Sequence, residues 1–324
     1  AQLRSAIEFL EYDVALAGYA GLRSLAEPAG PPLTVSDCLS ADCNPEGLPG
    51  RLLDAHTVEV TAGSGTPRRY TADNILVCTG GQPWVPEFEG SELVVTSDDI
   101  FDLPLFPRHL VVVGGGYIGC EFASIFRGLG ARVTQLYRRE QILRGFDDEV
   151  RDFVAAEMRK HGVDLRTDTD VARIEPVGDA RRLHLNDGST LDADVVLYAT
   201  GRRANTRALG LDALGVRLTD SGHIAADANF ATSVPNIYAL GDVVGRKELT
   251  PVALTEAMVL IDHLLGPEPG RAARSISYEN IATAVFTHPP IGTVGLSEAQ
   301  AREQCGAIRV YRSDFRPLQH TLSG

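Results

Sequence analysis

This chain of 324 residues lacks the features of a membrane or secreted protein. No apolar run is long enough to cross a bilayer. The first apolar stretch is interrupted by Glu8, Glu11 and Asp13, which argues against a signal peptide. Its five cysteines are too few and too scattered for a disulfide framework. We therefore expect no membrane partner and a cytoplasmic location.

Positive charge is also scarce, with 30 Lys and Arg residues against 43 Asp and Glu residues. The resulting net charge of −13 argues against a nucleic-acid partner. A content of 44% hydrophobic and 23% charged residues is ordinary for a soluble globular protein, and the length predicts two or three domains.

A glycine-rich loop is the strongest motif in the chain. Three β-branched residues, Val111–Val113, predict a buried parallel strand. Gly114, Gly116 and Gly119 follow at G-x-G-x-x-G spacing and open a predicted helix over residues 117–127. This arrangement favours a dinucleotide whose pyrophosphate lies at the helix N-terminus. The alternative is a glycine turn in a purely structural strand–helix–strand unit.

The next predicted strand, Ala131–Tyr137, indicates which dinucleotide binds. A site for NAD ends this strand with an acidic residue that binds the ribose 2′-hydroxyl. This chain instead has Arg138, Arg139 and Arg144, which suit a 2′-phosphate. The pattern therefore favours NADP(H) over NAD(H), the alternative being that these arginines are only solvated surface.

Three apolar strands end in small residues. Ile75–Gly80 reads ILVCTG, Val196–Gly201 reads VLYATG, and Ile237–Asp242 reads IYALGD. Small residues at a strand end let a dinucleotide pass close to the backbone. We therefore predict two nucleotide sites and an α/β fold of doubly wound, Rossmann-like domains.

Several segments between about residues 51 and 324 resemble the flavin-dependent pyridine nucleotide–disulfide oxidoreductases, class I, and among them the glutathione reductases. The matching segments are GGGYIGCEFASIF, YRREQILRGFD, ATGRRANT, TSVPNIYALGD, ELTPVAL, TAVFTHPPIGTVGLSEAQA and FRPLQHTLSG. LTPVA, HPPIGTVGL and the final segment favour glutathione reductase over dihydrolipoamide dehydrogenase. IGCEFASIFRGLG is also similar to soluble pyridine nucleotide transhydrogenases.

The resemblance implies roles for individual residues near the glycine loop. The residues that it implies for NADPH binding are Gly114, Gly116, Ile118, Gly119, Arg138, Arg144 and Gly201. Tyr117 matches an aromatic lid over the flavin, and Glu121 matches an acid beside the nicotinamide. Without the resemblance, Tyr117 would suit a protein core and Glu121 a solvated helix face.

The resemblance also implies an FAD site. Its residues are Thr79 and Gly80, Asp242 as the acid that binds the ribityl chain, and Thr250. Thr250 opens a predicted helix whose N-terminus would face the flavin O2 edge, where reduced flavin carries negative charge. The alternatives are a turn aspartate at Asp242 and an ordinary N-cap at Thr250.

The chain departs from this family in three places. Residues 1–50 lack the expected G-x-G-x-x-G motif for FAD. Cys38 and Cys43 have the spacing of the redox disulfide, but Asp37 and Asp42 oppose thiolate formation. The sequence ends at Gly324, before the family's acid/base histidine, and His288 is not that residue. We therefore expect the disulfide chemistry to be impaired in this chain.

The predicted domains follow from these matches. Residues 1–50 are unassigned, 51–88 and 217–272 form part of an FAD domain, 89–216 form the NADPH domain, and 273–324 begin an α+β interface domain. The resemblance implies electron transfer from NADPH through FAD to glutathione disulfide, in a homodimer without a metal. The alternatives are a transhydrogenase-like or dihydrolipoamide dehydrogenase-like flavoenzyme and an inactive nucleotide-binding fragment.

Overall fold

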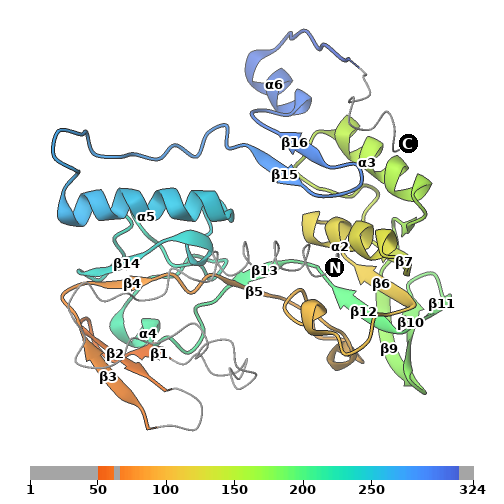
Figure 1. The fold of residues 1–324 in the computed structure, drawn as a ribbon, viewed down its shortest axis with the longest axis horizontal. Coiled ribbons are helices and arrows are strands. Elements are labelled where there is room, and N and C mark those ends of the chain that lie inside the picture. Colours follow the sequence, from red (N-terminus) through yellow and green to blue (C-terminus); the bar gives the residue numbers. More distant parts are fainter. Residues whose placement is uncertain (1–49, 62–65, 314–324) are drawn as a thin grey trace. The chain divides into compact units, whose positions relative to one another are not determined.

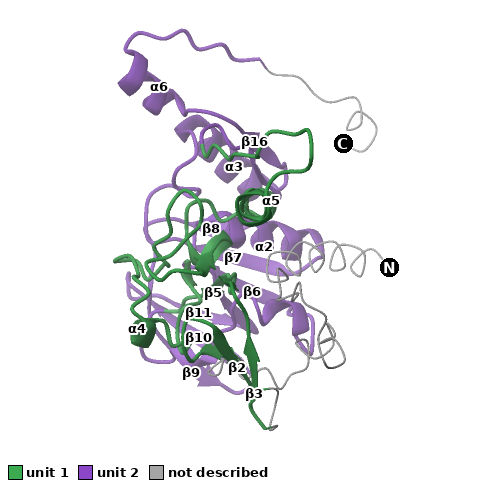
Figure 2. Ribbon diagram, turned by 90° about the vertical axis from the view of Figure 1, so that its left-hand side faces the viewer, with its two compact units in different colours: residues 1–85, 201–278 green, residues 86–200, 279–324 purple. Residues whose placement is uncertain are grey.

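The structure, a computed structural model, describes residues 50–61 and 66–313 and divides the chain into two compact units. Unit 1 consists of residues 1–85 and 201–278, and unit 2 of residues 86–200 and 279–324 (Figure 2). Within the described ranges, no helix combines the length and the apolar character that a membrane crossing requires.

Unit 2 is built on a four-stranded parallel sheet in the order β12-β6-β7-β8 (Figure 1). Its strands are β6 (His109–Val113), β7 (Arg132–Leu136), β8 (Asp164–Arg166) and β12 (Val195–Tyr198). Helix α2 (Tyr117–Gly128) connects β6 to β7, and helix α3 (Asp148–Lys160) connects β7 to β8. The predicted strand–helix–strand unit is therefore confirmed.

Apolar residues on one face of this sheet pack against both helices. Leu110 and Val112 of β6 lie in one buried cluster with Phe122 and Phe126 of α2 and Met158 of α3. Strands buried on both faces are typical of parallel sheets, and Val111 is also fully buried. The core therefore fixes the carboxyl end of β6, where the glycine loop begins.

A three-stranded antiparallel sheet follows β8 in the chain. Its strands are β9 (Val171–Val177), β10 (Ala180–Leu185) and β11 (Thr190–Ala193). The turn at residues 186–188 joins β10 to β11 in an antiparallel hairpin. Two short 3-10 helices, Ser91–Leu93 and Ile100–Asp102, precede the parallel sheet.

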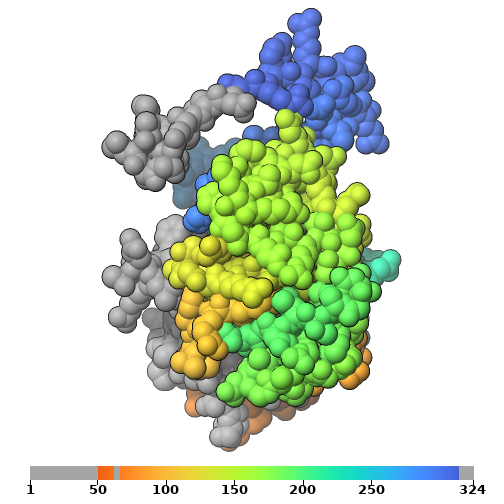
Figure 3. Space-filling model, turned by 90° about the vertical axis from the view of Figure 1, so that its right-hand side faces the viewer, coloured from red at the N-terminus to blue at the C-terminus, as the bar shows by residue number. Residues whose placement is uncertain are grey.

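The residues after 279 pack against the nucleotide-binding part of unit 2. They form the hairpin β15 (Thr283–Val285) and β16 (Ile291–Thr293), followed by helix α6 (Glu298–Cys305). Val285 lies fully buried in the core cluster of unit 2. Asp147, the N-cap of α3, accepts a hydrogen bond of 2.8 Å from the Glu298 N–H. In Figure 3, α3 is yellow-green and the described residues after 279 are blue.

The described residues of unit 1 form three small sheets. An antiparallel sheet is formed by β1 (Gly50–Leu52), β2 (Thr57–Val60) and β3 (Arg68–Thr71). Strand β4 (Ile75–Val77) pairs in parallel with β14 (Ile237–Ala239), and β5 (Gly81–Pro83) pairs antiparallel with β13 (Arg202–Ala204). The described part of the unit also contains helix α4 (Leu211–Leu214), a 3-10 turn (Gly241–Val243) and helix α5 (Thr250–Leu265).

Residues 201–216 pack within unit 1, although the sequence groups them with the nucleotide domain. Leu209, Leu211 and Val216 join a buried cluster with Ile75 and Ile237. The pairing of β13 with β5 draws the chain into this unit directly after Thr200.

Candidate functional site

Two glycines of the loop after β6 are required by close packing. Gly114 has φ +137°, and a Cβ atom there would lie 2.2 Å from the carbonyl oxygen of Ala199. A Cβ atom at Gly119 would lie 2.7 Å from the carbonyl oxygen of Gly114. These two glycines therefore let the loop approach the end of β12 and let α2 approach the loop.

Gly116 differs from them because a Cβ atom there would meet nothing within 4 Å. It is exposed and precedes α2 as its N-cap, with no side chain capping the helix. The first backbone bond of the helix runs from the Cys120 N–H to the Gly116 carbonyl. The space beside Gly116 is therefore open and no side chain caps the helix, which suits an anion at a helix N-terminus.

A buried amide supports the loop from below. Gln135 of β7 is fully buried, and its Nε2 donates to the Gly114 carbonyl at 2.8 Å and to Cys120 Sγ at 3.4 Å. Its Oε1 has no hydrogen-bond partner in the structure. The ring of Tyr137 lies so close to Gly115 that a Cβ atom there would stand 2.5 Å from it.

Sequence reasoning missed both Gln135 and Gly115. A long polar side chain near the end of the predicted strand was the only signal for Gln135. Nothing local in the sequence indicates the contact between Gly115 and Tyr137.

The predicted phosphate-binding arginines lie next to the glycine loop. Arg138 follows β7, whose last residues pair with β6, and the Leu143 N–H donates to the Gly115 carbonyl at 2.6 Å. Because Arg144 follows Leu143 in the chain, that bond places Arg144 next to the glycine loop. Arg138 and Arg144 are exposed, and neither forms an ion pair with another residue in the described part of the chain. Both guanidinium groups are therefore available to a 2′-phosphate.

Glu121 connects α2 to the end of β15. Its Oε1 accepts a hydrogen bond of 2.8 Å from the Phe286 N–H. Burial raises the pKa of the Glu121 carboxyl, and the Phe286 N–H opposes this shift. Tyr117 opens α2 with 42% of its surface exposed, which rules out the core alternative.

The predicted flavin residues gather at the carboxyl ends of β4 and β14 in unit 1. Thr79 and Gly80 follow β4, and Asp242 follows β14, the parallel partner of β4. Thr79 Oγ1 donates to the Asn205 carbonyl at 2.7 Å, and the Asn205 N–H donates to the Gly80 carbonyl at 2.9 Å. Two of the three strand ends noted in the sequence, Ile75–Gly80 and Ile237–Asp242, therefore lie side by side in the fold.

Asp242 is half-buried in this cluster. Burial raises the pKa of its carboxyl and Glu248 raises it further, while Arg202 lowers it. The Arg202 guanidinium hydrogen-bonds the Gly81 carbonyl, on the strand that pairs with β13. A cation therefore stands near the acid that is predicted to bind a ribityl chain.

Helix α5 begins at Thr250, as the sequence predicts. Leu249 is its N-cap, so the N-cap alternative for Thr250 is wrong. No side chain caps the helix. Pro251 has no N–H, and the Val252 N–H donates to the Leu249 carbonyl at 3.0 Å. What α5 offers to an acceptor such as the flavin O2 edge is therefore the positive end of its dipole.

Gly201 begins the second segment of unit 1, and its carbonyl accepts from the Trp84 N–H at 3.0 Å. Its predicted role in NADPH binding stays a prediction. Ile118, also predicted there, is partly buried in the first turn of α2.

The cysteines show no redox centre among the described residues. Cys38 and Cys43 lie outside the described residues. Burial raises the pKa of the Cys78 and Cys120 thiols to about 12, and Cys305 is exposed and unpaired. Cys78 and Cys120 therefore stay protonated at neutral pH and are poor nucleophiles.

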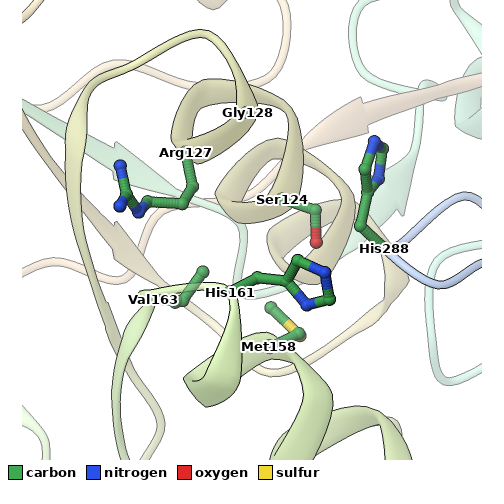
Figure 4. A pocket seen from close by; sticks show the side chains of 7 residues that line it. All are labelled: Ser124, Arg127, Gly128, Met158, His161, Val163 and His288. Carbon is green, nitrogen blue, oxygen red and sulfur yellow. The ribbon is translucent and has the colours of Figure 1, made fainter. Parts of the chain in front are cut away.

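A cavity of about 170 Å³ lies between the C-terminal ends of α2 and α3 (Figure 4). It is lined by Ser124, Arg127, Gly128, Met158, His161, Val163 and His288. The Ser124 hydroxyl points toward the ring of His161, whereas Arg127 points away from both histidines. No predicted nucleotide residue lines this cavity, so it is separate from the candidate site.

The fold and the glycine loop together define a dinucleotide-binding α/β protein. The model of the pyridine nucleotide-disulphide oxidoreductase family matches residues 49–257, and that of the dimerisation domain of the same proteins matches residues 281–324. The chain therefore belongs to the pyridine nucleotide-disulphide oxidoreductases.

The chain is also similar to individual disulfide reductases. The chain is 44% identical to glutathione reductase of Burkholderia cepacia, over 86% of this chain and 64% of that protein. It is 40% identical to trypanothione reductase of Trypanosoma congolense, over 85% of this chain and 57% of that protein. The chain thus spans less than two thirds of the length of these relatives.

A solved structure with a similar fold is the HOCl-induced flavoprotein disulfide reductase RclA from Escherichia coli. It has a TM-score of 0.73 and 32% identity, over 80% of this chain and 58% of that one. The α/β fold expected from the sequence is confirmed by this match. Glutathione reductases and their family use FAD and NADPH.

Proposed function

We propose that this chain belongs to an NADPH- and FAD-dependent disulfide oxidoreductase of glutathione reductase type, with glutathione disulfide as substrate. The observation that carries the proposal is the uncapped N-terminus of α2 beneath an open Gly116, beside Arg138 and Arg144. The resemblance to glutathione reductases supplies the substrate. We also propose a homodimer formed through the residues after 281 and a cytoplasmic location.

In this proposal the residues of unit 2 bind and orient NADPH. The N–H groups at the start of α2, among them that of Ile118, would hold the pyrophosphate, and the two arginines the 2′-phosphate. Glu121 and Tyr117 would border the nicotinamide, because they lie on the first turns of the same helix. The family's cofactors supply the hydride chemistry when bound.

The residues of unit 1 would hold the flavin. Asp242 would accept hydrogen bonds from ribityl hydroxyls, and the N-terminus of α5 would stabilise negative charge on the reduced ring. Thr79 and Gly80 lie at the same strand ends, while Gly201 stays a predicted NADPH contact. The described residues of unit 1 would therefore form one part of a flavin-binding site.

The disulfide step depends on a thiol pair that the described residues do not contain. Cys38 and Cys43 have the spacing for it, and their role stays a proposal. The acidic flanks argue for slow turnover, since they oppose thiolate formation.

The test is a stepwise reduction without oxygen. The chain is mixed with FAD, freed of excess flavin, and titrated with NADPH while the oxidised flavin absorbance is followed. We expect bleaching by NADPH and slow recovery when glutathione disulfide is added. Failure to retain flavin, or equal bleaching by NADH, would contradict the proposal. Loss of the recovery in Cys38→Ser would assign the thiol pair, whereas unchanged recovery would exclude it.

A further inference from the structure

Helix α5 carries a carboxylate in the interior of unit 1. Glu256 is only 1% exposed, on a helix that lies along β14 and β4 (Figure 1). A buried carboxylate costs several kcal/mol of folding free energy unless hydrogen bonds or opposite charges compensate it. The partners of Glu256 therefore indicate what the residue does.

Both carboxylate oxygens of Glu256 accept a hydrogen bond. Oε2 accepts from the backbone N–H of Gly241 at 2.7 Å, and Oε1 accepts from the Tyr278 hydroxyl at 2.6 Å. These short distances are typical of bonds to a charged acceptor. One oxygen thus binds the turn after β14, and the other binds the segment that follows α5.

A cation completes the network through the tyrosine. Arg246 Nη1 donates to the Tyr278 hydroxyl oxygen at 3.1 Å. The same guanidinium donates to the carbonyls of Ala226 and Asp227 and lies 5.6 Å from the centre of the Tyr278 ring. Arg246 therefore places a positive charge near Glu256 without binding it directly. The two carboxylate oxygens stay bonded to the Gly241 N–H and the Tyr278 hydroxyl.

The turn that Glu256 holds carries Asp242. Gly241 has φ +75° and begins the 3-10 turn Gly241–Val243, which has no side-chain cap of its own. The direction of the chain at Gly241 sets where the next carboxylate lies. Fixing the Gly241 N–H therefore fixes the position of Asp242.

We propose that Glu256 is a positioning residue for the Gly241–Asp242 turn, with Tyr278 and Arg246 holding its carboxylate in place. The inference rests on the proposed flavin site, because Asp242 is the group that would touch the ribityl chain. Glu256 acts on the flavin only through this turn. Its removal should loosen the turn first and weaken flavin binding as a consequence.

The same helix provides a matched control. Asp262 is also buried, at 6% exposure, and its carboxylate accepts from Arg274 Nη1 at 2.9 Å and from the Arg274 N–H at 2.8 Å. None of these contacts involves the turn. Asp262→Asn thus removes a buried charge from α5 without touching Gly241.

The experiment compares Glu256→Gln, Tyr278→Phe and Asp262→Asn in the full chain, at a temperature where all are folded. Hydrogen exchange of the Gly241 amide is measured without flavin, and the Kd for FAD is measured by quenching of flavin fluorescence. Glutamine keeps the size but has one acceptor oxygen for two donors. We expect at least about tenfold faster exchange and about tenfold weaker FAD binding, about 1.4 kcal/mol. Tyr278→Phe should show a smaller change in the same direction.

Asp262→Asn should lower the melting temperature yet leave Gly241 exchange and the FAD Kd unchanged. Equal effects of Glu256→Gln and Asp262→Asn on Gly241 exchange would overturn the inference. If the unmodified chain binds no FAD while only Glu256→Gln loosens the turn, the positioning role stands and the proposed flavin site fails.

Discussion

The glycine loop of unit 2 and the Gly241–Asp242 turn of unit 1 both follow a parallel strand, but they are supported differently. A neutral amide, Gln135, lies beneath the glycine loop and comes from the neighbouring strand. A buried carboxylate, Glu256, holds the turn, and it needs Tyr278 and Arg246 to balance its charge. Gln135 donates to a carbonyl of the glycine loop and takes up no N–H group at the start of α2, where the proposed phosphate would bind, whereas Glu256 accepts from the N–H of the turn itself.

The two arginines beside the glycine loop give the largest expected effect. Arg138→Gln with Arg144→Gln removes two charge-assisted contacts, each worth roughly 1.5–3 kcal/mol. NADPH affinity should fall more than about 100-fold, while NADH affinity changes little. Isothermal titration calorimetry measures both. Arg139→Gln, an adjacent exposed arginine outside the proposed pair, is the control, and an equal loss in that variant would show a general charge effect instead.

Alanine substitutions at Gly114 and Gly116 distinguish a glycine that packing requires from one that the proposed ligand contact requires. Gly114→Ala should cost at least about 3 kcal/mol of unfolding free energy, because of the positive φ and the clash with Ala199. Gly116→Ala should change stability by less than about 0.5 kcal/mol and still weaken NADPH binding. Urea unfolding and NADPH titration together test this. Equal destabilisation by both changes would be inconsistent with the distinct surroundings of the two glycines.

A substitution at Glu121 tests whether burying this carboxyl lowers the stability of the folded chain. Burial raises the pKa of its carboxyl in the folded chain. The folded state therefore binds the proton more tightly than the unfolded state, and this contribution to stability is lost as pH rises through the folded pKa. Glu121→Gln should be more stable than the parent at pH 7, with the difference vanishing below about pH 4. Thermal melts across this range measure it, and a constant difference would contradict the shift.

The segment between β16 and α6 gives the smallest expected effect. Val294 and Leu296 are exposed apolar residues in the segment that matches a dimerisation domain. Replacing both with Lys should weaken self-association several-fold in analytical ultracentrifugation, since exposed apolar patches promote it. Leu105→Lys, at another exposed site in unit 2, serves as the control. Association that is unaffected by replacing Val294 and Leu296 would argue against a homodimer through this segment.

Local patterns predicted the region around the glycine loop well. Helix α2 was expected over residues 117–127 and spans Tyr117–Gly128, because the glycines and the apolar spacing lie within one contiguous stretch. Contacts between distant residues could not be predicted. The bonds of Glu256 to Gly241 and Tyr278, and the pairing of β13 with β5, join segments that no local pattern connects. For the same reason the predicted domain boundary at residue 216 differs from the break between the compact units at residue 200.

The central claim is that the open loop and its arginines bind a phosphorylated dinucleotide. The most direct measurement is the ratio of the Kd values for NADH and NADPH in the unmodified chain, determined by calorimetry at one salt concentration. The account predicts that NADPH binds at least about 100-fold more tightly, because two guanidinium groups meet the 2′-phosphate. Equal affinity for the two nucleotides would contradict it.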